Sequence, residues 1–87
     1  MEIKFSLDAW EQYTGWQSQD KKTLGRINDL LKDIVRANPL AGIGKPEPLK
    51  GNLSGFWSRR IDEYNRLVYR IQGDVCQVVQ CKGHYAE

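Results

Sequence analysis

The sequence has little of several residue types: its 87 residues include one histidine, one methionine and two cysteines. It also contains no run of about 18 apolar residues, the length that a membrane-spanning helix needs. The first residues lack the basic start and the apolar stretch of a secretory signal peptide. We therefore expect a cytoplasmic protein with no membrane contact. A chain of this length has room for one domain, residues 1–87, and no second core.

The two cysteines, Cys76 and Cys81, are predicted to lie on one strand. At about 3.3 Å per residue their Cα atoms lie roughly 16 Å apart, whereas a disulfide needs less than about 7 Å. One histidine and two separated cysteines also make a poor zinc site. The sequence has no glycine-rich phosphate loop and no cluster of carboxylates for Mg²⁺. We therefore expect two buried, unpaired thiols and no metal or other cofactor.

Hydrophobic periodicity predicts two helices followed by three strands. Ser6 is a suitable N-cap for a first helix that begins at Leu7. Pro39 ends the second helix, because a residue before proline avoids helical geometry. The expected elements are a strand 2–6, a helix 7–17, a second helix ending before Pro39, a long connection 39–55 and strands 56–61, 66–71 and 75–81. This order, β-α-α-β-β-β, predicts an α+β fold in which two helices pack on one face of an antiparallel sheet and leave the other face open.

Basic residues are concentrated in the second half of the chain. Residues 45–70 contain six basic and three acidic residues. Alternation along the predicted strands places Arg60 and Arg66 on the open sheet face, and places Arg59 on the opposite face, where a structural or peripheral role is expected. Arg70 shares a face with Arg66 and is interpreted as solvated surface. An excess of arginine on one surface is typical of phosphate binding.

Several side chains of the sequence could act together on RNA. Glu47 is held between two prolines in a basic segment, and the sole histidine, His84, follows an apolar strand and precedes Tyr85. A carboxylate can remove a proton from a ribose 2′-OH, an imidazolium can protonate the departing 5′ oxygen, and guanidinium groups can stabilise charge on the phosphate. This combination favours RNA cleavage without a metal. Taken alone, Glu47 has a simpler interpretation as an exposed acidic residue of a loop, and His84 as an ordinary surface histidine.

Longer motifs contain these residues and resemble a known family. They are Gly44-Lys45-Pro46-Glu47-Pro48-Leu49-Lys50, Asn52-Leu53-Ser54-Gly55-Phe56-Trp57-Ser58-Arg59-Arg60-Ile61, Asn65-Arg66-Leu67-Val68-Tyr69 and Cys81-Lys82-Gly83-His84-Tyr85. Over nearly the whole chain the sequence resembles the YoeB toxins of bacterial type II toxin–antitoxin systems, a branch of the RelE-like ribonucleases. The resemblance implies a fold like that of microbial ribonucleases and an mRNA interferase that cleaves mRNA in the ribosomal A site.

The resemblance also implies roles for individual residues. Glu47 resembles the family's general base, His84 its general acid, and Arg66 its main stabiliser of the phosphate transition state. Tyr85 resembles a second catalytic or orienting residue at the C-terminus. Supporting phosphate contacts are implied for Lys50 and Arg60. The implied partners are translated mRNA, the 70S ribosome and a YefM-like antitoxin, and the sequence leaves open whether the free protein forms a homodimer.

Two departures from the family pattern lie near the C-terminus. Lys82 and Gly83 stand where family members often have arginine and an aromatic residue, and Ala86 and Glu87 extend the chain beyond the last motif. We expect residues 82–87, which are poor in apolar side chains, to be mobile. Two other functions remain as alternatives: a degenerate toxin that only binds its antitoxin or the ribosome, and a single-strand RNA-binding module.

Overall fold

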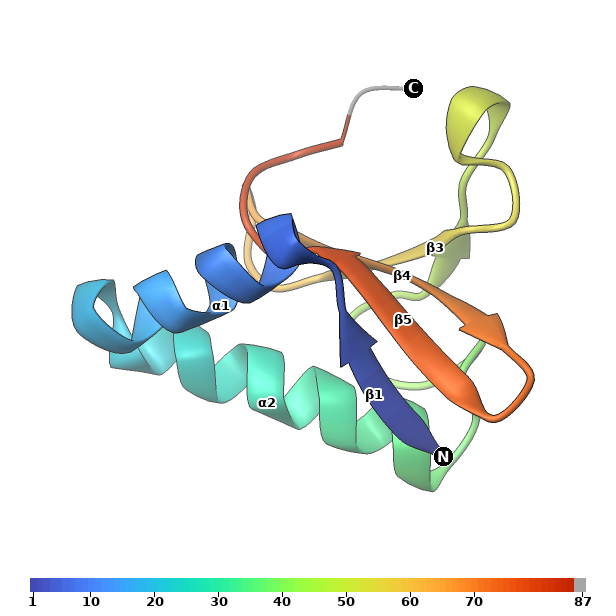
Figure 1. Ribbon diagram of the computed structural model, residues 1–87, viewed down its shortest axis with the longest axis horizontal. Helices are drawn as coiled ribbons and strands as arrows, with labels where there is room; N and C mark the ends of the chain where they lie inside the picture. The colour runs from blue at the N-terminus through green and yellow to red at the C-terminus, as the bar shows by residue number, and fades with distance from the viewer. Residues whose placement is uncertain (86–87) are drawn as a thin grey trace.

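The computed structural model describes residues 1–85, which form two helices and a five-stranded sheet (Figure 1). The elements, in chain order, are β1 (Glu2–Phe5), α1 (Leu7–Gln19), α2 (Lys21–Arg36), β2 (Glu47–Pro48), the short 3-10 helix η1 (Gly51–Leu53), β3 (Trp57–Arg60), β4 (Arg66–Gln72) and β5 (Val75–Gln80). The strands lie in the order β1-β5-β4-β3-β2. The predicted α+β fold, with two N-terminal helices packed on a sheet, is confirmed.

Two predictions about the sheet are wrong. β1 pairs with β5 in parallel, so the sheet is mixed, whereas the other neighbouring strands are antiparallel. The expected order of elements has no strand within the connection 39–55, but this segment contains η1 and the short strand β2, which pairs with β3. The order is therefore β-α-α-β-β-β-β. Alternating side chains show which face of a strand is buried but carry no information on the direction of its partner.

Side-chain caps set the start of both helices. The Ser6 hydroxyl accepts a hydrogen bond from Ala9 N at 3.1 Å and begins α1 as predicted. α1 continues through Gln19 rather than ending at Gln17. The Asp20 carboxylate then accepts two backbone hydrogen bonds from the first turn of α2. Because one residue separates the helices, α2 turns back beneath α1 (Figure 1).

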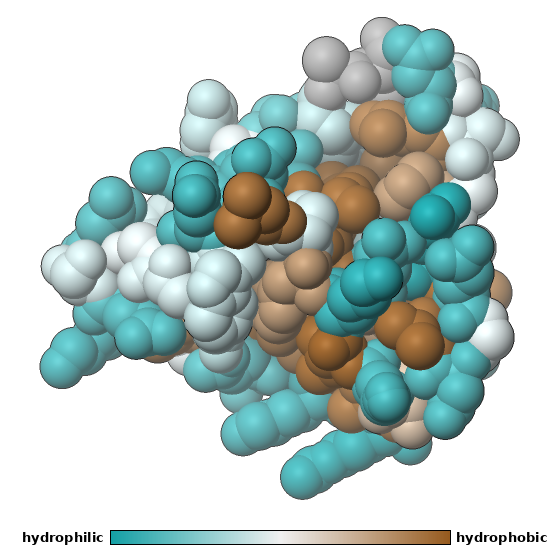
Figure 2. All heavy atoms as spheres, in the orientation of Figure 1, coloured by the Kyte–Doolittle hydropathy of each residue, from teal (hydrophilic) through white to brown (hydrophobic). Residues whose placement is uncertain are grey.

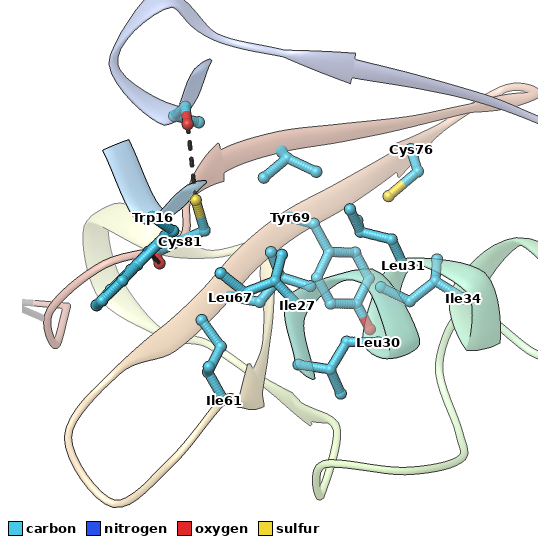
Figure 3. Close-up of a cluster of buried hydrophobic side chains, with 12 residues drawn as sticks. Trp16, Ile27, Leu30, Leu31, Ile34, Ile61, Leu67, Tyr69, Cys76 and Cys81 are labelled. Atoms are coloured by element: carbon cyan, nitrogen blue, oxygen red, sulfur yellow. Dashed lines mark hydrogen bonds between the residues drawn. The ribbon is translucent and has the colours of Figure 1, made fainter. Parts of the chain in front are cut away.

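The hydrophobic core lies between α2 and the sheet (Figure 3). Tyr69 of β4 is completely buried in this layer, with its ring directed toward the helix. The side chains that α2 contributes recur at helical spacing, which is why they share one face. They are Ile27, Leu30, Leu31 and Ile34.

Both thiols are confirmed as buried and unpaired. Burial raises the pKa of Cys76 to about 11 and that of Cys81 to about 12, so both are neutral near pH 7. Trp16 of α1 donates its indole hydrogen to the Cys81 carbonyl oxygen at 2.9 Å. This contact fixes the start of the C-terminal segment against α1.

Arg59 has a structural role, as its strand face indicated. Its side chain is completely buried and donates to Asp33 Oδ2 at 2.6 Å. Its Nε donates to the Tyr69 hydroxyl at 3.1 Å. The remaining acceptors are the backbone carbonyl oxygens of Asn38, Pro39, Ala41 and Ile43. One guanidinium therefore ties the segment between α2 and β2 to the sheet.

The sheet face away from the helices is covered at its centre, which corrects the prediction of an open face. Ser58 of β3 is 3% exposed and its partner Val68 of β4 is 1% exposed. Leu49, just after β2, is buried as well, and neither it nor Val68 belongs to the core between helices and sheet. On either side of this covered centre the face reaches solvent, at the exposed Arg60 and the half-buried Arg70.

Apolar side chains reach the surface at the opposite edge of the sheet. Ile3, Leu7 and Trp10 are 40%, 72% and 48% exposed, and Figure 2 shows hydrophobic atoms over β1 and the start of α1. The Phe5 ring lies 5.8 Å from the Trp10 ring, as a hydrophobic staple requires. Because β1 and β2 are the two edge strands, this apolar edge lies away from Glu47.

Candidate active site

Glu47 lies on β2, where it is paired with Ser58 of β3 at the edge of the sheet. Pro48 follows it and restricts the backbone. The next residue, Leu49, is buried and donates a backbone hydrogen bond to Phe56 O at 2.9 Å. The backbone that carries Glu47 is therefore fixed, while its carboxylate is exposed.

Arg60 of β3 and Arg66 of β4 lie directly opposite each other. Like charges in this position destabilise a sheet, and a phosphate between them would offset the repulsion. Arg66 Nη1 donates to the carbonyl oxygens of Asp62 and Asn65 at 2.8 and 3.2 Å, which holds its guanidinium against the β3–β4 turn. Lys50 is exposed and lies between β2 and η1.

The C-terminal segment is anchored beside Arg66. Arg66 N donates to Gly83 O at 3.0 Å, and Gly83 N donates to Asn65 Oδ1 at 2.7 Å. Gly83 has a φ of 77°, a left-handed conformation that glycine adopts without strain. An aromatic residue, which the family often has here, would be strained in this conformation. The predicted mobility of residues 82–87 therefore does not extend to Gly83.

Tyr85 connects the C-terminal segment to Glu47. Its hydroxyl donates to Glu47 Oε1 at 2.9 Å, although 38 positions separate the two residues. The exposed His84 ring lies against the Tyr85 ring with centroids 4.6 Å apart, and its Nδ1 is 3.2 Å from the Tyr85 carbonyl oxygen. The carboxylate, phenol and imidazole thus lie on one surface. The extension by Ala86 and Glu87 lies outside the described residues.

Asn65 is a part of this site that the sequence did not single out. Its Oδ1 binds Gly83 N and its carbonyl oxygen binds Arg66 Nη1, so one residue contacts both sides of the site. Its Nδ2 donates to Asp62 Oδ2 at 3.0 Å and closes the turn. Burial raises the pKa of Asp62, but hydrogen bonds from Asn65 and Tyr64 outweigh burial and hold this pKa below its ordinary value. The sequence signal was a polar turn before Arg66, which indicated only a hairpin.

Replacing Asn65 with alanine is expected to release the C-terminal segment without unfolding the core. The variant loses the acceptor for Gly83 N, a hydrogen bond of about 1 kcal/mol, so exchange of the Gly83 amide hydrogen should rise about fivefold. Hydrogen–deuterium exchange followed by NMR measures this change. Glu63→Gln, in the same turn, is the control and should leave the Gly83 amide as it is. An unchanged Gly83 amide in Asn65→Ala would show that other contacts hold the segment.

Within residues 1–85, no three His, Cys, Asp or Glu side chains are grouped so that they could hold a metal ion. In the same part of the chain, no helix has the length and apolar character needed to cross a membrane.

The groups that the candidate site presents are one carboxylate, one imidazole, one phenol and two guanidinium groups, from Glu47, His84, Tyr85, Arg60 and Arg66.

Solved structures share this fold. The YoeB/ParE toxin from Agrobacterium tumefaciens superimposes with a TM-score of 0.94 at 45% identity, covering 98% of this chain and 100% of that chain. YafQ from Escherichia coli strain BL21(DE3), at 19% identity, has the same fold with a TM-score of 0.72, covering 95% of this chain and 92% of that chain. The fold is therefore the one seen in a bacterial YoeB/ParE toxin.

The sequence comparisons show which toxin family this is. The family model for the YoeB-like toxin of bacterial type II toxin–antitoxin systems matches residues 5–85. Toxin YoeB of Streptomyces coelicolor is 52% identical over 85 residues, covering 98% of this chain and 100% of that protein. Toxin YoeB of Escherichia coli strain K12 is 49% identical with the same coverage. The chain belongs to the YoeB-like toxin family, and the resemblance seen in its motifs is confirmed.

Two of the similar structures contain more than one chain. One is a YoeB–YefM complex from Staphylococcus aureus, with 47% identity, a TM-score of 0.91 and coverage of 98% of both chains. The other is a YoeB dimer from the same organism, with 48% identity, a TM-score of 0.90 and coverage of 98% of both chains. These relatives therefore form an antitoxin complex and a dimer.

Proposed function

We propose that this toxin is a ribosome-dependent endoribonuclease that cleaves mRNA by attack of a ribose 2′-OH. The observation that carries the proposal is the hydrogen bond between Tyr85 and Glu47. It connects the C-terminal His84–Tyr85 pair with the carboxylate on β2, while Gly83 is bound beside Arg66. A carboxylate, an imidazole and guanidinium groups from three parts of the chain thereby lie on one surface, which supports roles as base, acid and phosphate-binding groups in metal-free RNA cleavage.

Each residue has a defined role in the proposed reaction. Glu47 accepts the proton of the 2′-OH as the 2′ oxygen forms a bond to phosphorus. The bond from phosphorus to the 5′ oxygen breaks, and protonated His84 gives its proton to that oxygen. Arg66 stabilises the charge on the phosphate, with Arg60 and Lys50 in support. Tyr85 orients Glu47 through its hydroxyl.

The two alternative functions use less of this site. A degenerate toxin that only binds antitoxin or ribosome, or a single-strand RNA-binding module, would need the arginines but not Glu47. The carboxylate repels RNA phosphate, so a binding surface gains nothing from it. Induced expression in bacteria separates the functions, because only the nuclease predicts growth arrest that His84→Ala relieves.

The proposed partners follow from the same surface. We propose that mRNA in the A site of the 70S ribosome is the substrate, which places the protein in the cytoplasm. The complex from Staphylococcus aureus supports a YefM-like antitoxin as inhibitor, and the dimer from that organism supports a homodimer. An acidic antitoxin segment would cover the Arg60–Arg66 pair and displace His84 from the site.

Cleavage of free RNA by a high concentration of the protein is expected to continue in EDTA and to leave 2′,3′-cyclic phosphate and 5′-hydroxyl ends. The proposed acid and base act directly on the ribose and the leaving oxygen, so no step needs a metal. Free RNA is used because ribosomes themselves need Mg²⁺. End-specific labelling identifies the ends, and His84→Gln purified in parallel controls for contaminating nucleases. Products with 5′-phosphate ends, or loss of cleavage in EDTA that Mg²⁺ restores, would contradict the mechanism.

A further inference from the structure

A second group of side chains lies on the same sheet face as the candidate active site. Arg70 of β4 is paired with Gln77 of β5, and Gln77 is paired with Lys4 of β1. Phe56 precedes Trp57, whose partner on β4 is Tyr69, so Phe56 lies next to Arg70. We call Phe56, Arg70, Gln77 and Lys4 the Arg70 row. The neighbours of these residues along each strand pack toward the helices, so the Arg70 row faces away from them.

Arg70 is held in one position by two contacts. Its guanidinium carbon lies 5.1 Å from the centroid of the Phe56 ring. Its Nε donates to Gln77 Oε1 at 2.7 Å. Within residues 1–85 no acceptor binds its two Nη groups. The expectation that Arg70 is ordinary solvated surface is therefore wrong: the side chain is half-buried and fixed, with its outer donors available.

The Arg70 row lies at a fixed distance from the proposed reaction centre. Arg66 and Arg70 are four residues apart on the same face of β4, which corresponds to about 13 Å. The covered centre around Ser58 and Val68 lies between them. An RNA strand that places one phosphate at Arg66 could pass over this centre and reach Arg70 with a neighbouring nucleotide.

We propose that the Arg70 row is an RNA subsite that binds a nucleotide flanking the cleaved bond. Arg70 would bind its phosphate through the two Nη groups, with Lys4 adding positive charge. The Phe56 ring and the guanidinium plane would stack against a base. This proposal rests on the proposed function, because it assumes that RNA lies on this sheet face.

The composition of the row favours RNA over an acidic peptide. An acidic segment would need positive charge alone, whereas the row combines a planar cation with an aromatic ring and an amide. Two acidic residues near the Arg70 row also reduce its net positive charge, which weakens its attraction for an acidic peptide. Glu2 lies two positions from Lys4 on β1, and Asp74, which is 3.5 Å from the N-terminal amine, lies in the β4–β5 turn.

Binding of a mixed-sequence single-stranded RNA oligonucleotide tests the proposal. The measurements use full-length protein carrying His84→Gln, which suppresses cleavage, and fluorescence anisotropy over a series of salt concentrations. Arg70→Gln should weaken binding and lower the slope of log affinity against log salt by about 0.7, the effect of one lost phosphate contact. Phe56→Leu should weaken binding by roughly fivefold or more and leave that slope unchanged. The matched control is Arg36→Gln, which removes an exposed positive charge from the end of α2.

The outcomes separate this proposal from the proposed function. Equal RNA affinity and equal salt slope for Arg70→Gln and Arg36→Gln would overturn the subsite. It would also be overturned if Arg70→Gln weakened binding of an acidic antitoxin segment but not binding of RNA. Circular dichroism verifies that each variant is folded, and Arg70→Lys, which keeps the charge, provides a second variant with an expected intermediate affinity. If the protein without His84→Gln cleaves no RNA but Arg70→Gln still weakens RNA binding, the nuclease proposal fails, and the Arg70 row stands as an RNA-binding surface but not as a subsite beside a cleaved bond.

Discussion

Replacing Glu47 with glutamine is expected to lower the rate of RNA cleavage about 10²–10⁴-fold, the usual contribution of a general base. Glutamine keeps the shape of the side chain and can accept the hydrogen bond from Tyr85, but it cannot take the proton of the 2′-OH. Binding to the ribosome should be kept. Single-turnover cleavage at saturating ribosome concentration measures the chemical step.

The same loss is expected for His84→Gln, because the amide cannot protonate the departing 5′ oxygen. Glu63→Gln in the exposed β3–β4 turn is the matched control for the loss of a carboxylate, and it should retain the original rate. Antitoxin binding and thermal unfolding verify that the variants are folded. A rate within about threefold of the original for either Glu47→Gln or His84→Gln would show that the residue is not the acid or base.

Arg59→Met is expected to lower the free energy of unfolding by about 3 kcal/mol or more, because buried acceptors lose their donors. The guanidinium binds Asp33, the Tyr69 hydroxyl and four backbone carbonyl oxygens, and methionine replaces none of these bonds. The total free energy of unfolding of a small domain is only about 5–15 kcal/mol. Urea unfolding at pH 7 measures the loss. Arg70→Met, at a half-buried arginine of the same sheet, should cost much less.

The effect of Arg59→Met should depend on pH. The hydrogen bond from Arg59 lowers the pKa of Asp33 below its ordinary value, although partial burial raises it. The stabilisation by ionised Asp33 is therefore complete above the ordinary value of about 3.9 and is lost as the pH falls through the lower folded value. The difference in unfolding free energy between the two proteins should narrow below about pH 4. A difference that stays constant down to pH 2 would exclude the Asp33 contribution.

Sequence patterns predicted the local structure because the responsible contacts lie within a few residues. Ser6 accepts its hydrogen bond from Ala9, three positions away, and the apolar stripe of α2 follows the period of the helix itself. Alternation along β3 separated the buried Arg59 from the exposed Arg60 for the same reason. The motifs around Glu47 and His84 also indicated the family before any fold was known.

Residues that act through distant partners could not be recognised in this way. Asn65 had the signature of a turn, and its contact with Gly83 spans 18 positions. Arg70 had the signature of solvated surface, because its contact with Phe56 depends on the pairing of β3 and β4. In both cases the residue type is common at exposed surface positions, and only the contact with a distant residue reveals a more specific role.

The sequence by itself determined the two helices, the strands β1 and β3 to β5, the buried thiols and the family of this toxin. The tertiary structure decided that β1 pairs in parallel with β5, that the far sheet face is covered at its centre, and that Tyr85 binds Glu47. Local elements depend on the backbone and side-chain preferences of neighbouring residues. The Tyr85–Glu47 contact instead depends on where the whole sheet places its edge strand and its C-terminal segment, which no local pattern encodes.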